Sequence, residues 1–176
     1  GEFLPEIPCG FAFGKIEQMA LIHGCGFTGG KALYGIARCC PFRAAGVPCM
    51  GIEPAANVAE VAIERGIPTI IRFFGKRTAL EVASEYGKPD VLLGNNVLAH
   101  VPDINDFVGG MKLLLKNGGV ITMEFPHLQS LMAENQFDTI YHEHFSYLSF
   151  VAVERIFAHH GITLFDVEEL PTHGGS

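Results

Sequence analysis

The stretch GVPCMGIEPAANVAEVAIERG, residues 46–66, decides the fold because it predicts a strand and a helix in direct succession. Its first half is a short apolar run that ends at Glu53-Pro54, which is typical of a buried strand and its exit. Its second half carries alanines and valines at helical spacing and stops at Gly66. The stretch therefore predicts one strand–helix unit with an acidic residue where the strand ends.

The same alternation continues through the rest of the chain. Strands are expected at 46–54, 67–75, 90–96, 120–126 and 162–170, and helices at 55–66, 76–89, 103–119 and 150–161. We expect Leu80, Ala83 and Tyr86 to share one face of the helix at 76–89. Asp103 is the expected N-cap of the helix at 103–119, and the helix at 150–161 should begin after Ser149. Strands that alternate with helices of about ten residues predict right-handed βαβ units, and hence an α/β fold with a parallel sheet covered on both faces.

Polar residues stand where three of these strands end. They are Glu53, the pair Asn95-Asn96, and Glu124 with the nearby His127. Each one alone is more often a helix cap or a turn former. In an open parallel sheet, however, ligands bind beyond the carboxyl ends of the strands. Three polar strand ends in an otherwise apolar set therefore favour a ligand site at that edge.

The region before residue 45 contains MALIHGCGFTGGKALYGI, residues 19–36, which predicts a strand, a glycine loop and a helix. Gly24 and Gly26 begin a G-x-G-x-x-G pattern that lets the backbone approach a nucleotide closely. Glu53, some distance downstream at a strand end, would then bind ribose hydroxyls. These features alone suit NAD equally well, so an NAD-dependent Rossmann oxidoreductase stays open as an alternative.

Composition limits the class of protein. The 176 residues are 48% hydrophobic and 18% charged, which is typical of a single globular domain. The net charge of −7 and the absence of a basic stripe argue against nucleic-acid binding. No apolar run is long enough to span a bilayer, and the first residues do not resemble a signal peptide, so we expect a cytoplasmic protein. The five cysteines suggest free thiols, and the oligomeric state is not determined.

Several segments taken together resemble the SAM-dependent sugar C-methyltransferases, which methylate nucleotide-linked keto-sugars. They are GIEPAANVAEVA (51–62), FFG (73–75), GNNVLAHVPD (94–103), FDTIYHEHFSY (137–147) and PTHGGS (171–176). The resemblance covers residues 45–176, about three quarters of the chain. It implies a Rossmann-like class I methyltransferase domain with a mostly parallel sheet, incomplete and truncated at its C-terminal end.

Residues 1–44 depart from this family. The family has an acidic strand end and a short Asn-Asp-Gly-like loop there, whereas this chain has His23 and a cysteine-containing glycine loop. We interpret 1–44 as an atypical N-terminal segment. Our hypothesis is an altered translation joined to the domain near FRAAGVP, residues 42–48. Translating the coding DNA in the other two frames tests it, because one frame should restore the family-like loop.

The resemblance also implies roles for individual residues. Glu53 would take the ribose hydroxyls of S-adenosyl-L-methionine, and Asn95 and Asn96 would border its methionine moiety and donor methyl group. His144 would be the general base, with Tyr141 and Glu143 as neighbours in the same site. His100 would be a second histidine of the catalytic pocket.

These residue types suit carbon methylation. Carbon becomes a nucleophile only when a proton leaves the position beside a carbonyl, and histidine, whose unperturbed pKa is about 6.5, accepts protons near neutral pH. The developing oxyanion needs a donor, which Tyr141 or His100 would supply. Glu143 would orient an imidazole or stabilise its protonated form. If these parts fail to assemble, the chain is an inactive methyltransferase fragment.

A metal site is the main rival interpretation of the YHEH segment. His142, Glu143 and His144 do not form the H-E-x-x-H pattern, and residues two apart point in different directions on a helix. We therefore expect no bound metal. We expect His142 to be a packed histidine, and the neighbouring aromatic residues Phe137, Phe145 and Tyr147 to belong to the core.

Overall fold

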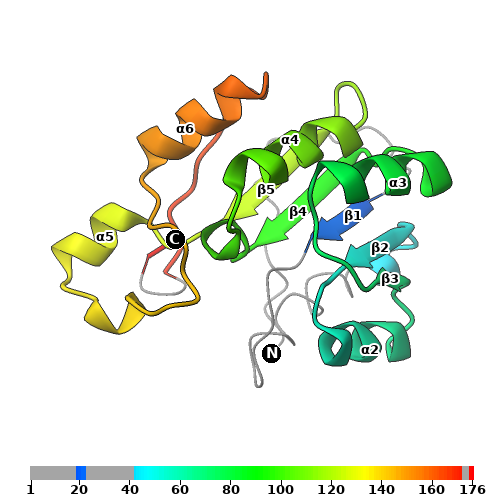
Figure 1. Cartoon of the computed structure of the whole chain (residues 1–176), viewed down its shortest axis with the longest axis horizontal. Coiled ribbons are helices and arrows are strands. Elements are labelled where there is room, and N and C mark those ends of the chain that lie inside the picture. The colour runs from blue at the N-terminus through cyan, green and yellow to red at the C-terminus, as the bar shows by residue number, and fades with distance from the viewer. Residues whose placement is uncertain (1–18, 23–41, 172–174) are drawn as a thin grey trace.

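The computed structural model describes residues 19–22, 42–171 and 175–176, and it contains one parallel five-stranded sheet in the order β3-β2-β1-β4-β5 (Figure 1). The strands are β1 Met19–Ile22, β2 Cys49–Ile52, β3 Thr69–Ile70, β4 Val91–Asn95 and β5 Val120–Glu124. Every strand pair is parallel. The predicted α/β class with a parallel, Rossmann-like sheet is confirmed.

The strand order reverses at β1. From β1 the chain steps outward to β2 and β3, and then returns to place β4 and β5 on the other side. Met19 of β1 therefore pairs with Cys49 on one side and with Val91 on the other. In doubly wound sheets a ligand crevice opens where the order reverses, beyond the carboxyl ends of the strands. That place lies between the ends of β1 and β4. The predicted loop with Gly24 and Gly26 lies outside the described residues.

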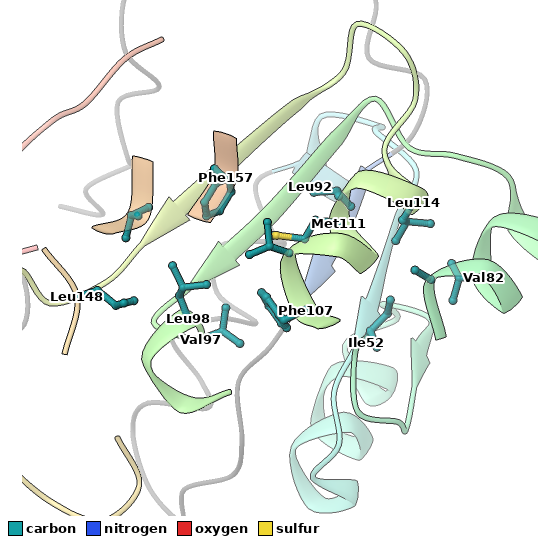
Figure 2. Close-up of a cluster of buried hydrophobic side chains, with 13 residues drawn as sticks. Ile52, Val82, Leu92, Val97, Leu98, Phe107, Met111, Leu114, Leu148 and Phe157 are labelled. Carbon is teal, nitrogen blue, oxygen red and sulfur yellow. The ribbon is translucent and has the colours of Figure 1, made fainter. Parts of the chain in front are cut away.

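Helices cover both faces of the sheet. They are α2 Ala56–Glu64, α3 Lys76–Tyr86, α4 Ile104–Leu114 and α6 Phe150–His159, whereas α5 Leu128–Ala133 has no buried residue and lies away from the sheet in Figure 1. Successive residues of β4 point to opposite faces: Leu92 packs in the core under α3, α4 and α6, whereas Val91 and Leu93 pack in the cluster with α2. Figure 2 shows Phe107 and Met111 of α4 among the buried side chains of the larger cluster. The sheet is therefore the middle of three layers.

Local signals in the sequence account for several helix ends. Asp103 caps α4 by accepting from the backbone N–H of Asp106, and Ser149 caps α6 by accepting from that of Ala152, as predicted. Gly66 and Gly87 follow α2 and α3 with φ of 77° and 84°, a left-handed conformation that glycine adopts at no steric cost.

The buried face of α3 differs from the prediction. Leu80 and Tyr86 are 56% and 47% exposed, whereas Thr78, Ala79 and Val82 are buried. The face of α3 that packs in the core with α4 is the one with Ala79 and Val82, and Leu80 lies roughly a quarter turn away from it. The two helices come closest at the start of α3, where a Cβ on Gly110 of α4 would lie 2.7 Å from the carbonyl carbon of Gly75.

The prediction of a strand at 162–170 is also wrong. These residues form no strand, although Leu170 exchanges two backbone hydrogen bonds with Ser176. Alternating apolar residues produce a strand only where a partner strand supplies a ladder, and this segment pairs with none among the described residues. The strand predicted at 67–75 shortens to the two residues of β3.

The segment between β5 and α6 has a structure that the periodicity did not predict. It contains α5 and the 3-10 turn η2 Phe137–Thr139, and another 3-10 turn, η1 Leu98–His100, follows β4. The segment returns to the core at Leu148, which is 5% exposed and lies near Leu98 in Figure 2. Phe137, Phe145 and Tyr147 are 74%, 60% and 36% exposed, so the prediction that they belong to the core is wrong.

Two further predictions concern cysteines and membranes. Cys49 is half-buried and forms no disulfide within the described residues, while the other four cysteines lie outside them. Within the part of the chain that the structure describes, no helix combines the length and apolarity that crossing a bilayer requires.

Candidate active site

Glu53 lies directly after β2 and is almost completely buried. Its side chain is 2% exposed, and Oε1 accepts a hydrogen bond from the backbone N–H of Ala55 at 2.7 Å. Burial raises the pKa of Glu53 to about 7, and the Ala55 N–H opposes only part of that shift. A carboxylate in this position is poorly solvated, so a ligand that brings hydroxyl donors would stabilise its charge.

The end of β4 carries two asparagines with different surroundings. Asn95 Nδ2 donates to Glu124 Oε2 at 2.8 Å, and the two residues are also partners in the β4–β5 register. Asn96 has φ of 50°, a left-handed conformation, and its backbone N–H donates to the carbonyl of Glu124 at 2.8 Å. Asn96 Oδ1 is buried and accepts no hydrogen bond from any residue that the structure describes. A buried acceptor without a donor is costly, so it suits a ligand that brings one.

Glu53 and Asn96 lie on the two sides of β1, because β2 and β4 are its neighbours in the sheet. Both acceptors follow the carboxyl ends of their strands, where the strand order reverses. A ligand with hydroxyl donors at one end and an N–H donor at the other fits this pair of acceptors.

The YHEH segment forms a cluster of rings around His144. The His144 ring centroid is 4.3 Å from that of Tyr141, 4.7 Å from that of His100 and 5.7 Å from that of Tyr147. His144 Nδ1 lies 2.9 Å from the carbonyl oxygen of Thr139. A carbonyl only accepts, so Nδ1 carries the hydrogen, and in the neutral ring Nε2 holds the lone pair. His144 is therefore oriented as a proton acceptor through Nε2.

His100 has the same arrangement. Its Nδ1 donates to the carbonyl oxygen of Glu143 at 3.1 Å, which again leaves the lone pair of the neutral ring on Nε2. The two segments are joined by backbone bonds, because the carbonyl of Ala99 accepts from the N–H groups of Phe145 at 2.8 Å and Ser146 at 3.2 Å. The fold thus brings together His100, Tyr141 and His144, three residues that the sequence predicted for one site.

Glu143 and His142 differ from their predicted surroundings. The Glu143 side chain makes no hydrogen bond within the described ranges, and its contact with an imidazole is through its carbonyl oxygen. The imidazoles are oriented by backbone carbonyls, so the orienting role predicted for the Glu143 carboxylate is not what the contacts show. His142 is exposed, and the prediction that it is packed is wrong.

A small hollow adjoins the imidazole of His144. Ala99 follows β4 and Pro126 follows β5, so the hollow lies on the carboxyl side of the sheet, where Figure 1 places the segment between β5 and α6. It is lined by Ala99, Pro126, Leu128, Leu131, Thr139, His144, Ser146 and Tyr147. His144 is half-buried and is one of the residues that line this hollow.

Two residues of this edge have structural or orienting roles that sequence alone did not assign. His127 Nε2 accepts from the backbone N–H of Phe150 at 3.3 Å, at the start of α6. Glu124 orients Asn95. Across residues 19–22, 42–171 and 175–176, no three His, Cys, Asp or Glu side chains gather in a way that would hold a metal ion.

A family model described as a methyltransferase domain matches residues 30–167. The chain belongs to this methyltransferase-domain family. The C-methyltransferase NovU of Streptomyces niveus is 41% identical over 135 residues, which are 77% of this chain and 32% of that protein. The chain therefore spans about a third of the length of this curated relative.

Solved structures support the same fold. A SAM-dependent methyltransferase from Thermotoga maritima matches with a TM-score of 0.59 and 15% identity, over 93% of this chain and 72% of its own. The plantazolicin methyltransferase BpumL, solved with SAH, matches with a TM-score of 0.58 and 13% identity, over 80% of this chain and 54% of its own. The class I methyltransferase fold is thus confirmed.

Family membership decides between the two candidate cofactors, NAD and S-adenosyl-L-methionine. The sheet order alone suits either a nicotinamide or a methyl-donor cofactor. A methyltransferase domain implies S-adenosyl-L-methionine as the methyl donor, and this favours the methyltransferase over the NAD-linked oxidoreductase.

Proposed function

We propose that this domain methylates a carbon atom of a nucleotide-linked keto-sugar, with His144 as the base that forms the enolate. The observation that carries the proposal is the oriented imidazole: His144 Nδ1–H is held by the Thr139 carbonyl, so Nε2 is the proton acceptor, and His144 is one of the residues that line a small hollow. The 41% identity to a C-methyltransferase supports carbon as the methyl acceptor. The sugar class rests on the motifs at 94–103 and 137–147.

Three residues fit S-adenosyl-L-methionine, which supplies an electrophilic methyl group when bound. The buried carboxyl of Glu53 would accept hydrogen bonds from the ribose hydroxyls, which stabilise its charged form. The unpartnered Oδ1 of Asn96 would accept from the ammonium group of the methionine moiety. Asn95 would border the same moiety, with its amide held in place by Glu124.

His144 would remove a proton from the carbon beside the sugar carbonyl. The proton moves to Nε2, and the electron pair of the broken C–H bond becomes the enolate. Positive charge then resides on the imidazolium, whose Nδ1–H still donates to the Thr139 carbonyl. A base held in one orientation acts without first losing rotational freedom.

The enolate oxygen needs a donor, and the tautomers decide which side chain supplies it. Neutral His100 has its hydrogen on Nδ1, directed at the Glu143 carbonyl, so donation from Nε2 requires its protonated form. The hydroxyl of Tyr141 donates without a change of charge, and its ring lies against that of His144. We therefore assign the enolate oxygen to Tyr141 and a supporting position in the pocket to His100.

Hydrogen exchange tests the base directly. The chain is incubated in D₂O with SAH and a panel of nucleoside-diphosphate keto-hexoses, and loss of the carbon-bound hydrogen is followed by proton NMR. His144→Gln should slow the exchange by at least a hundredfold, which is on the order of the contribution of a general base. Affinity for SAH should not change.

The exposed His142 provides the matched control. His142→Gln changes the same residue type two positions away and should exchange at the rate of the unmodified chain. Exchange at that rate in His144→Gln would exclude His144 as the base. If the unmodified chain is folded but binds neither SAH nor NAD, the alternative that it is an inactive methyltransferase fragment is correct.

A further inference from the structure

Thr139 contacts the proposed base, although it lies outside the YHEH motif. Its carbonyl oxygen accepts from His144 Nδ1 at 2.9 Å, and its hydroxyl donates to the carbonyl of Gln136 at 2.6 Å. One residue therefore joins the imidazole to the turn η2. The hydroxyl fixes the turn, and the turn fixes the direction of the carbonyl.

Backbone hydrogen bonds hold this turn together with the hydroxyl: the N–H of Phe137 donates to the carbonyl of Asn135 at 2.9 Å, and that of Ile140 donates to the carbonyl of Phe137 at 3.1 Å. The backbone N–H of Thr139 reaches the Gln136 carbonyl only at 3.3 Å, so the hydroxyl makes the shorter of the two bonds to that oxygen. Phe137 at the start of η2 is 74% exposed, and Ile140 after it is 53% exposed. With little apolar burial to hold η2, the position of the Thr139 carbonyl depends on its local hydrogen bonds.

The direction of this carbonyl has a chemical consequence. Neutral imidazole carries its hydrogen on Nδ1 or on Nε2, and the partner of one nitrogen decides which. If the carbonyl moves away from Nδ1, a fraction of His144 adopts the Nε2–H tautomer. That fraction has no lone pair on Nε2 and accepts no proton there.

We propose that Thr139 is a positioning residue, which holds His144 in the Nδ1–H tautomer through its carbonyl and holds that carbonyl through its hydroxyl. Its effect on catalysis rests on the proposed role of His144 as base. Its effect on the tautomer does not, and so the two are tested separately. His100 provides an internal reference because its Nδ1–H is held by a different carbonyl, that of Glu143.

Imidazole NMR reads the tautomers without any substrate. Long-range ¹H–¹⁵N correlation spectra of the ¹⁵N-labelled chain at alkaline pH distinguish Nδ1–H from Nε2–H, and His144→Gln assigns the His144 signals. We expect Nδ1–H on both His100 and His144. In Thr139→Val, which keeps the shape but loses the hydroxyl, His144 alone should become a mixture of tautomers. Thr139→Ser, which keeps the hydroxyl, should restore the single tautomer.

Substrate exchange provides the catalytic readout. Thr139→Val should lower the exchange rate about fivefold, as expected for loss of one ordinary hydrogen bond, and Thr139→Ser should recover it. SAH affinity should be the same in both variants, which shows that the domain still folds. An Nε2–H tautomer on His144 of the unmodified chain would overturn the proposal. So would a Thr139→Val variant with unchanged spectra and rate.

The outcomes also separate this proposal from the proposed function. If His144→Gln exchanges substrate normally while the Thr139 variants shift the His144 tautomer, the base assignment fails and the Thr139–His144 contact stands. If His144→Gln is inactive and the tautomer does not respond to Thr139, the base assignment stands and Thr139 has no positioning role.

Discussion

Protonation of Glu53 should control cofactor affinity near neutral pH. The carboxyl is 2% exposed, and burial raises its pKa to about 7 from 4.5. Ribose hydroxyls donate hydrogen bonds, so they favour the ionised carboxylate and bind more tightly to it. Affinity for SAH should therefore rise as the pH rises through 7 and then level off. Glu53→Gln is the corresponding perturbation, because the amide does not ionise.

The size of the effect follows from the pKa. At pH 6 about one-tenth of the Glu53 carboxyls are ionised, and at pH 8 about nine-tenths are. The dissociation constant for SAH should therefore be roughly tenfold larger at pH 6 than at pH 8. Calorimetric titration at pH 6 in two buffers of different ionisation enthalpy should also detect the release of close to one proton.

Two variants complete the test. Glu53→Gln should bind SAH more weakly at every pH, with a dissociation constant that does not change between pH 6 and pH 8. Glu64→Gln alters an exposed carboxyl at the end of α2 and should keep the pH dependence of the unmodified chain. A pH-independent affinity in the unmodified chain, without proton release, would refute the role of Glu53.

The same pKa shift predicts how the unliganded fold responds to pH. Between pH 4.5 and about 7 the folded chain keeps the Glu53 proton that the unfolded chain loses, so the folded state binds more protons. The contribution of Glu53 to the free energy of unfolding therefore falls as pH rises through this window. The full loss is about 3 kcal/mol, from about 1.4 kcal/mol per pKa unit. Urea denaturation should show that Glu53→Gln lacks this decrease.

Three further substitutions test other parts of the structure. Leu148→Ala should lower the free energy of unfolding by about 2–5 kcal/mol in urea denaturation because Leu148 is 5% exposed in the core; a loss below about 1 kcal/mol would contradict its anchoring role. Gly110→Ala should lower the thermal midpoint, because the alanine Cβ would lie 2.7 Å from the Gly75 backbone. Alanine is the better helix former, so a raised midpoint would argue against the close contact between Gly110 and Gly75. Asn96→Gly should keep the thermal midpoint, because glycine adopts φ of 50° freely. The loss of Oδ1 should weaken SAH binding about fivefold in calorimetry. An unchanged affinity would exclude Asn96 from the cofactor site.

Most of the fold was predictable because its signals are local. The apolar runs that became β2, β4 and β5, the caps Asp103 and Ser149, and the glycines after α2 and α3 act within a few residues of themselves. The errors have a different origin. Leu80 and Tyr86 of α3 are exposed although they are apolar, because Ala79 and Val82 make the face that packs in the core with α4, and tertiary packing decides which face is buried.

The sequence allowed the residues of the candidate site to be proposed, but it did not allow the distances and hydrogen bonds between them to be predicted. Glu53, Asn95 and Asn96 end strands, which the sequence shows directly. His100, Tyr141 and His144 came from motifs, and motifs do not contain distances. The contact between Thr139 and His144 had no sequence signal, because it is made by a backbone carbonyl that every residue possesses.

By itself, the sequence determined the alternation of strands and helices, the polar strand ends and the motifs that indicate a methyltransferase, because each depends on residue type and short spacing. Tertiary structure alone decided which surfaces meet. It buried Glu53 and raised its pKa, left Asn96 Oδ1 without a donor among the described residues, and joined His144 to Thr139 and His100 to Glu143. Burial and hydrogen-bond partners depend on segments that are distant in the chain, and these set the charge of the carboxyl and the tautomers of the two histidines.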